Sequence, residues 1–187
     1  IVYALGLQHR LAAVTFECNE PPHARSTHRV VVGGADTSGM PVDEIDRMVR
    51  DRLAAGEDLY TLDEGALAEI DPALILSQDL CRVCAVPAGR IDDAVAHLGC
   101  AAEVVMLDPY SLDEVIESIT TVATAAGVAE SAIPVVADLR HRLAAVRDRV
   151  AGRPRPRVAV VEWVDPLFAG GHWIPDQVVA AGGEPVG

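Results

Sequence analysis

Two cysteines with CxxC spacing, Cys81 and Cys84, lie in segment 78–85 together with the amide of Gln78 and the carboxylate of Asp79. The apolar run 73–77 comes directly before this segment and predicts a buried parallel strand. Segment 78–85 therefore follows the carboxyl end of a strand, where open α/β sheets usually bind ligands. The two thiols could belong to a metal site, a redox pair, a disulfide or the wall of a ligand pocket.

The surroundings of the CxxC motif favour the last two interpretations. No second CxxC or HxxxH follows at the spacing of a zinc site. A thioredoxin-type pair would open a helix after the first strand of the fold, whereas this motif follows an internal strand and lacks an upstream aromatic residue. We therefore favour a local disulfide or two unreactive thiols in a pocket wall, with a thiol-redox or metal-carrying protein as the alternative.

Two further loops follow predicted strands and offer polar or aromatic side chains. His172 and Trp173 come after Gly170-Gly171, and an indole at a strand end can form a platform for a flat ligand. His172 could ligate a metal, donate a hydrogen bond or simply face solvent, and Trp173 could instead pack under its own helix. The loop 17–20, with Glu17, Cys18 and Glu20, is expected at the same edge of the sheet, and its alternative is a solvated turn.

The elements that position these loops alternate between strands and helices, which predicts an α/β fold with a parallel sheet covered on both faces. Strands are predicted over 11–16, 28–32, 73–77, 103–107 and 157–163, and helices over 41–55, 61–70, 87–98, 111–126, 130–151 and 174–181. Capping-box patterns at 61–64 and 111–114 open two of these helices. The loop 165–173 precedes the last helix, and no strand is predicted after that helix.

The helix over 130–151 is long for a crossover and indicates a spacer between two lobes. We expect an N-terminal α/β lobe over 1–127, a backbone linker helix over 128–152 and the start of a C-terminal α/β lobe over 153–187. Residues 1–6 have the pattern of the last turns of a helix that ends at a C′ glycine. The chain is accordingly expected to be a fragment that contains most of one lobe, the helix and the start of another.

The composition restricts the classes of function. Acidic residues outnumber basic ones 28 to 15, and the formal charge of −13 argues against a nucleic-acid partner and against an electrostatic hold on anionic lipid. No apolar run approaches the ~18 residues of a membrane span. The sequence contains no convincing catalytic triad or paired-carboxylate constellation, and none of the motifs GxGxxG, GxxxxGK[ST], GxSxG and HExxH.

The order of the segments IVYALGL, AAVTFECNEPP, DPALIL, QDLCRVCAV, SLDEVIESI and PRVAVVEWVDPLFAGGHWIPDQVVAAGG resembles one family. It is the Fe-siderophore/cobalamin class of solute-binding proteins of ABC importers, and the closest resemblance is to cobalamin-binding members, in which QxLCxVCA and GHW segments recur. The resemblance implies a bilobal Rossmann-like receptor whose parallel sheets are joined by a long backbone helix. It also implies a binding protein rather than an enzyme, a membrane ABC permease as partner and no nucleic acid. The location it implies is extracytoplasmic, with a cytoplasmic location as the alternative.

The same resemblance implies a ligand site and a docking site. The transported ligand would be cobalamin, without a prosthetic group or a resident metal, and haem or a ferric siderophore is the alternative for the same fold. The residues implied in ligand binding are Glu17, Cys18, Glu20, Gln78, Asp79, Leu80 and Cys81 in the first lobe and Phe168, His172 and Trp173 in the second. Asp63 and Glu64 would dock on arginines of the permease, although Gly65 stands where a further acid is expected, and Glu20 stands where the family often has a stacking tyrosine.

Overall fold

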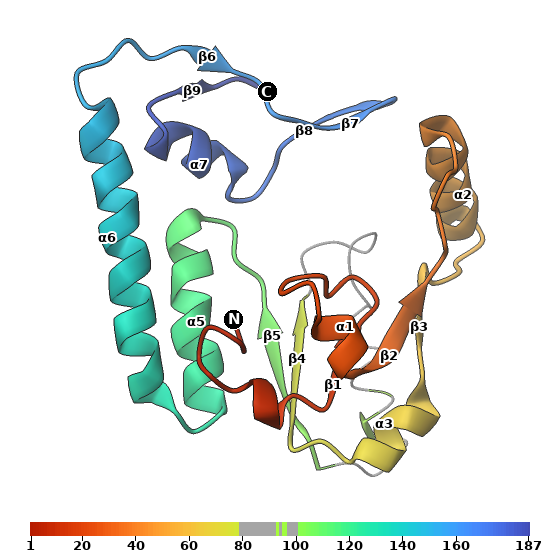
Figure 1. Cartoon of the computed structure of the whole chain (residues 1–187). Coiled ribbons are helices and arrows are strands. Elements are labelled where there is room, and N and C mark those ends of the chain that lie inside the picture. Colours follow the sequence, from red (N-terminus) through yellow and green to blue (C-terminus); the bar gives the residue numbers. More distant parts are fainter. Residues whose placement is uncertain (79–92, 94, 97–100) are drawn as a thin grey trace. The chain divides into compact units, whose positions relative to one another are not determined.

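The computed structural model describes residues 1–78, 93, 95–96 and 101–187. The chain divides into two compact units, Ile1–Asp108 and Pro109–Gly187 (Figure 1). The helix predicted over 87–98 lies almost entirely outside the described residues.

The first unit contains a three-stranded sheet with the order β1-β2-β3. β1 (Ala13–Thr15) is parallel to β2 (Arg29–Gly34), which confirms the first two predicted strands. β3 (Tyr60–Leu62) is antiparallel to β2 and was not predicted. The connection between β1 and β2 includes the short helix α1 (Ala24–Thr27), and the turn η1 (Gln8–Arg10) precedes β1.

The helix that follows β3 begins later than the sequence predicts. Thr61 pairs with Gly33 in the β2–β3 ladder, so it is not available as the first cap of a helix. α3 (Glu64–Ile70) is capped instead by Asp63, whose Oδ1 accepts the N–H of Ala66 at 2.9 Å. The predicted capping box at 61–64 is therefore wrong, because the strand extends two residues into it.

The C′ glycine predicted at Gly6 is confirmed by the hydrogen bonds around it, although the residues before it form a turn. Leu7 N–H donates to Val2 O at 3.0 Å and Gly6 N–H donates to Tyr3 O at 3.0 Å, which is the Schellman pattern of a helix end. Gly6 has φ +72°, as a C′ glycine requires.

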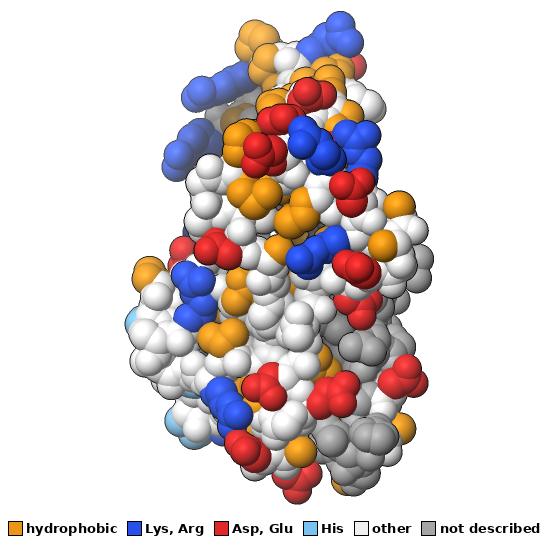
Figure 2. Space-filling model, turned by 90° about the vertical axis from the view of Figure 1, so that its right-hand side faces the viewer, with side chains coloured by type: hydrophobic (Ala, Val, Ile, Leu, Met, Phe, Trp, Pro, Cys, Tyr) orange, Lys and Arg blue, Asp and Glu red, His pale blue; other side chains and the backbone are white. Residues whose placement is uncertain are grey.

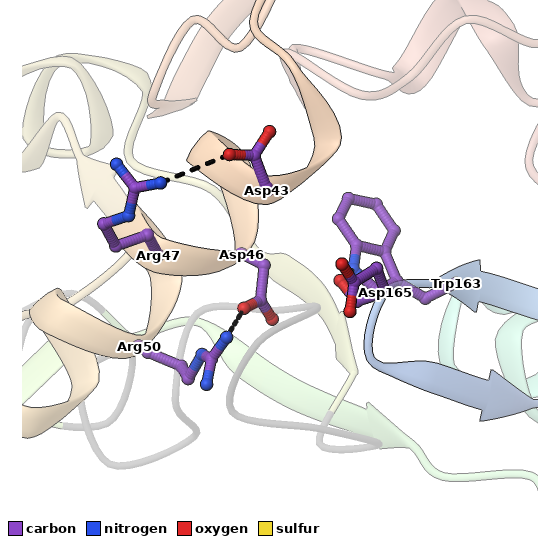
Figure 3. A network of polar contacts seen from close by, with 6 residues as sticks. All are labelled: Asp43, Asp46, Arg47, Arg50, Trp163 and Asp165. Carbon is purple, nitrogen blue, oxygen red and sulfur yellow. Dashed lines mark hydrogen bonds and ion pairs between the residues drawn. The ribbon is translucent and has the colours of Figure 1, made fainter.

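Helix α2 (Val42–Ala54) confirms the helix predicted over 41–55. Its surface carries two acid–arginine pairs four residues apart, Asp43–Arg47 at 3.2 Å and Asp46–Arg50 (Figure 3). Such pairs stabilise a helix by about 0.3–0.5 kcal/mol each.

The other sheet of the first unit has two strands. β4 (Leu74–Gln78) is parallel to β5 (Glu103–Leu107), and the register runs from Leu74 opposite Glu103 to Gln78 opposite Leu107. Both strands were predicted.

The second unit begins with two packed helices, α5 (Leu112–Ala125) and α6 (Ala132–Val150), joined through η2 (Ala129–Ser131). The predicted capping box opens α5: Ser111 Oγ accepts the N–H of Glu114 at 3.2 Å, and Glu114 Oε2 accepts the N–H of Ser111 at 2.9 Å. The apolar core of this helix pair is formed by the buried residues Ile116, Ile119, Val122, Ala123 and Ala132. α6 is the long helix predicted over 130–151.

The segment predicted as one strand over 157–163 forms two. β6 (Arg157–Val158) pairs in parallel with β9 (Glu184–Pro185), a strand that follows the last helix, where none was predicted. β7 (Val161–Val164) forms an antiparallel hairpin with β8 (Leu167–Ala169), so part of the predicted loop 165–173 is extended strand.

The predicted α/β fold class is confirmed, with parallel strand pairs, a long helix and a closing helix α7 (Ile174–Ala180). The three-part division at 127 and 152 stays a prediction. None of the described helices has the length and apolar character that a membrane span needs.

Candidate ligand-binding site

The loop after β1 is a tight, hydrogen-bonded turn. Cys18 N–H donates to Thr15 O at 3.1 Å, Cys18 Sγ lies 3.4 Å from Thr15 Oγ1, and Asn19 N–H donates to Glu17 O at 2.8 Å. Cys18 is a half-buried free thiol, whereas Glu17 and Glu20 are exposed. The two carboxylates are thus accessible to a ligand, and the thiol takes part in the turn itself.

Phe16, the residue directly before this turn, is held in place by several contacts. A Cβ atom on Gly34 would lie 2.5 Å from the Phe16 ring, so the ring packs directly on the glycine backbone. The ring also lies 6.0 Å from the ring of Tyr60, and Arg25 Nη1 donates to Phe16 O at 2.7 Å. These contacts place Glu17 and Glu20 on a well-supported loop at the carboxyl end of β1.

The second predicted loop begins at Gln78, the exposed last residue of β4. Asp79, Leu80 and Cys81 lie outside the described residues, as does Cys84. β1 and β4 belong to different hydrogen-bonded sheets, so a shared sheet edge does not bring loop 17–20 and Gln78 together. Their proximity remains a prediction.

In the second unit, His172 lies between two aromatic rings. Its ring centroid is 5.3 Å from that of Tyr110 and 5.9 Å from that of Trp173. His172 and Tyr110 are exposed, Tyr110 at 58%. We refer to Tyr110, His172 and Trp173 as the aromatic cluster. The cluster adds Tyr110 to His172 and Trp173, the two residues predicted to bind the ligand.

His172 has φ +51°, an uncommon conformation for a residue with a Cβ atom. Residues in this region are enriched at ligand sites, where the surrounding structure holds them in place. The strain and the exposed ring together mark His172 as a candidate functional residue.

Three consecutive backbone N–H groups hold the aromatic cluster in place. Those of Tyr110 and Ser111 donate to Glu114 Oε2 at 2.7 and 2.9 Å, and that of Leu112 donates to Asp176 Oδ2 at 2.9 Å. The bonds to Glu114 stabilise its carboxylate and lower its pKa, the donor of Tyr110 contributing most. The start of α5, with Tyr110, is thereby tied to the first turn of α7, which follows His172 and Trp173.

Two glycines precede His172 and differ in their surroundings. A Cβ atom on Gly170 would lie 2.6 Å from Ile174 Cγ2 and 3.3 Å from Val160 Cβ, whereas one on Gly171 would meet nothing within 4 Å. Gly170 N–H also donates to Val160 O at 2.8 Å. Gly170 therefore allows the chain to pass closely between Val160, the residue before β7, and Ile174, the first residue of α7.

Phe168 lies in β8 and is 53% exposed. It pairs in the hairpin with Trp163, whose Nε1 donates to Asp165 O at 2.9 Å (Figure 3). Val164 and Leu167 at the hairpin end are 68% and 71% exposed. This hairpin presents apolar side chains that a ligand could cover, although no ring contact joins Phe168 to the aromatic cluster among the described residues.

The two acids predicted to dock on a permease occupy the start of α3 and are exposed. Asp63 caps the helix and its Oδ2 lies 3.9 Å from Arg29 Nη2. Arg29 makes a shorter pair with Glu69, at 2.5 Å, and this hydrogen bond is the main reason why the pKa of Arg29 is raised. Glu64 forms no ion pair with any described residue.

The described residues do not form a metal-binding cluster. No three His, Cys, Asp or Glu side chains gather in a way that could hold an ion, in the ranges that the structure covers. The first unit offers the exposed carboxylates of Glu17 and Glu20, and the second unit, taken by itself, offers the aromatic cluster and Phe168. Exposed rings of this kind suit contact with a flat ligand.

Comparison with solved structures shows the fold of periplasmic binding proteins. The periplasmic vitamin B12 binding protein BtuF of Vibrio cholerae has 19% sequence identity, and the match, with a TM-score of 0.67, covers 98% of this chain and 60% of that chain. The periplasmic heme-binding protein RhuT from Roseiflexus has 18% identity, with a TM-score of 0.69 and the same coverage. A possible iron-binding periplasmic solute-binding protein from Staphylococcus epidermidis has 15% identity, with a TM-score of 0.70, 98% coverage of this chain and 61% of that chain.

No family model matches the sequence, and no curated protein does. The chain spans about 60% of the length of the solved structures named above. At these identities the likeness demonstrates a common fold, and the predicted α/β fold class with parallel sheets and a long helix is confirmed at that level. This chain has the fold of the periplasmic solute-binding proteins that include binders of vitamin B12, heme and iron.

Proposed function

We propose that this chain belongs to the substrate-binding component of an ABC importer and binds a metal-centred macrocycle, with cobalamin as the first candidate. The observation that carries the proposal is the match over 98% of the chain to binding proteins with this fold, one of which binds vitamin B12. The QxLCxVCA and GHW segments support cobalamin within that class. Location outside the cytoplasm, where a periplasmic protein acts, is part of the same proposal.

The proposed binding mode uses flat rings and exposed carboxylates. The corrin ring would be covered by the aromatic cluster and by Phe168, while the carboxylates of Glu17 and Glu20 accept hydrogen bonds from the amides at its edge and the amide of Gln78 accepts or donates them. Asp79, Leu80 and Cys81 complete the proposed wall. Burying apolar ring surface contributes about 25 cal/mol per Å² to the free energy of binding. The affinity would therefore come from buried area, without a covalent step.

Haem is the second candidate, and one observation favours it. His172 presents an exposed imidazole beside the phenol of Tyr110. Imidazole nitrogen and phenolate oxygen are both ligands of haem iron. A His172→Ala variant distinguishes the two ligands, because loss of an iron ligand would shift the Soret band of bound haem, whereas cobalamin would lose only a ring contact and keep its absorption spectrum.

The ligand is tested by absorbance titration of the protein in its full natural length with cyanocobalamin, haemin and a ferric siderophore. We expect saturable 1:1 binding of cyanocobalamin, with weaker binding of the other two. Preferred binding of haemin or the siderophore would show that this compound, and not cobalamin, is the ligand, and the proposed class of binding protein would stay the same. Binding of none of the three would contradict the proposal.

The rival from another class is a thiol-redox or metal-carrying protein that uses Cys81 and Cys84. Thiol titration and metal analysis test it directly. A depressed thiol pKa with disulfide turnover, or one zinc per chain that is lost in Cys81→Ser, would support the rival and contradict the receptor.

The proposed permease contact is formed by Asp63 and Glu64. The variant Asp63→Asn/Glu64→Gln removes both charges and keeps the helix cap, because asparagine caps as well as aspartate. It should reduce transport in reconstituted vesicles while ligand affinity is unchanged. The matched control, Asp43→Asn/Glu44→Gln, removes the two acids in the first turn of α2, and equal losses in both variants would contradict this role.

A further inference from the structure

We propose that Arg29 regulates the permease contact, because its guanidinium competes with a cation of the permease for the carboxylates at α3. The inference rests on the proposed function of Asp63 and Glu64 as the permease contact, and it adds a residue that sets the strength of that contact. Arg29 is the first residue of β2, and Asp63 is the N-cap of α3. Both residues belong to the first unit.

Arg29 contacts two carboxylates, one at each end of α3. Its Nη1 lies 2.5 Å from Oε2 of Glu69, in the last turn of the helix, and its Nη2 lies 3.9 Å from Oδ2 of Asp63. Because one guanidinium reaches both acids, the two carboxylates lie beside the same point of the surface. The side chains of Arg29, Asp63 and Glu69 are 45%, 56% and 70% exposed. A partner protein can therefore reach all three charges.

Asp63 keeps one oxygen for a partner. Its backbone N–H donates to Val31 O at 2.8 Å, its backbone O accepts the N–H of Leu67 at 3.0 Å, and its Oδ1 accepts the N–H of Ala66 at 2.9 Å. Its Oδ2 accepts no hydrogen bond from the described part of the chain, because the 3.9 Å to Arg29 is too long for one. The carboxylate is thus held in place by its other contacts, and Oδ2 retains its capacity to accept a hydrogen bond from the permease.

The charge of Arg29 opposes docking in two ways. It neutralises part of the negative charge of Asp63 and Glu69 that attracts a cation of the permease, and it repels that cation directly. The hydrogen bond that Arg29 donates to Glu69 raises the pKa of the guanidinium, which therefore stays charged at any pH at which the receptor works. At about 4–7 Å in water, one unit charge changes the affinity for another charge by about three- to sixfold.

A purely structural role explains Arg29 less well. Exposed ion pairs contribute little to stability, and Oδ1 of Asp63 caps α3 without help from Arg29. Acid–arginine pairs also lie elsewhere on the surface, such as Asp43–Arg47 on α2, and Figure 2 shows arginines beside acidic side chains on the face that it draws. Arg29 differs from Arg47 because it lies against an acid of the proposed permease contact.

The test is the binding of labelled receptor, in its full natural length, to its ABC permease reconstituted in phosphatidylcholine vesicles. Arg29→Gln should bind about three- to sixfold more tightly than the parent at low salt. This gain should shrink in about 0.5 M salt, where exposed charges are screened. Arg29→Lys keeps the charge and should bind as the parent does. In the Asp63→Asn/Glu64→Gln background the gain from Arg29→Gln should be smaller, because the carboxylate for which the two cations compete is absent.

The matched control is Arg47→Gln, which removes an arginine that pairs with Asp43 at 3.2 Å and should bind the permease as the parent does. Far-UV circular dichroism checks that all variants are folded. Parental or weaker binding by Arg29→Gln, or an equal gain in Arg47→Gln, would overturn the role of Arg29, and the permease contact would stand if Asp63→Asn/Glu64→Gln still weakens binding. Parental binding by Asp63→Asn/Glu64→Gln would instead contradict the permease contact itself, and the role of Arg29 with it.

Discussion

Gly170 should control the position of the aromatic cluster, and Gly170→Ala tests this directly. The added Cβ atom would lie 2.6 Å from Ile174 Cγ2, 3.1 Å from Ile174 Cβ and 3.3 Å from Val160 Cβ. Rotation of the Ile174 side chain can relieve the contact with Cγ2, but not the contact with Cβ, which moves only with the backbone. The first turn of α7 therefore has to shift, and with it the adjacent His172 and Trp173.

The expected loss of stability follows from these distances. Inserting a methyl group into a packed site costs about 1–3 kcal/mol. The lower conformational entropy of the unfolded chain offsets about 0.4–1 kcal/mol of this cost, because φ of Gly170 is outside the left-handed region. A net loss of about 1–2 kcal/mol lowers Tm by about 2–8 °C for a chain of this size.

Gly171→Ala is the matched control, since its Cβ would meet nothing within 4 Å and its φ is also outside the left-handed region. We expect Tm to remain constant or to rise by about 1–4 °C. Thermal unfolding is followed by far-UV circular dichroism, and ligand affinity is measured on the same samples. Equal Tm changes in the two variants, or an increase for Gly170→Ala, would refute the close packing of Gly170 against Ile174 and Val160.

Three other predictions concern the start of α5. Ser111→Ala removes a side-chain cap and should lower the free energy of unfolding, measured by urea denaturation, by about 1 kcal/mol. Ser131→Ala, at an N-cap without a side-chain hydrogen bond, should lower it much less. Similar losses in the two variants would contradict the capping role of Ser111. The lowered pKa of Glu114 means that its carboxylate stabilises the fold above the ordinary glutamate pKa and that this stabilisation disappears as pH falls through the lowered value. The Tm difference between the parent and Glu114→Gln should accordingly be constant above about pH 5 and shrink in more acidic solution, and a difference that grew there would have the wrong sign. Asp176→Ala removes the acceptor of Leu112 N–H and should lower the free energy of unfolding by about 1 kcal/mol. Asp176→Asn should lower it less. Identical losses in the two variants would argue against this hydrogen bond.

Much of the fold follows from local sequence signals. Helices α2, α5 and α6 have an apolar periodicity and clear start signals. The four predicted strands of the first unit, β1, β2, β4 and β5, are apolar runs between turn residues. The missed strands β3, β8 and β9 have three, three and two residues. Such short segments carry no periodicity of their own, because their pairing with a distant strand defines them.

The candidate site was predicted less completely, for a related reason. Tyr110 was missed, although an aromatic residue just after the strand over 103–107 is a usable signal in a chain with 4% aromatic residues. Its contact with His172, and the bond from Leu112 to Asp176 across 64 residues, depend on tertiary packing. No spacing rule in the sequence relates such distant positions.

The affinity of the Trp173→Ala variant for the preferred ligand tests the central claim most directly. The control is Trp163→Phe, which replaces the only other tryptophan of the chain, and both affinities are measured by isothermal titration calorimetry. If the aromatic cluster is a wall of the ligand site, Trp173→Ala should weaken binding by about tenfold or more, and Trp163→Phe should bind within about threefold of the parent. Parental affinity in Trp173→Ala would contradict the proposed site.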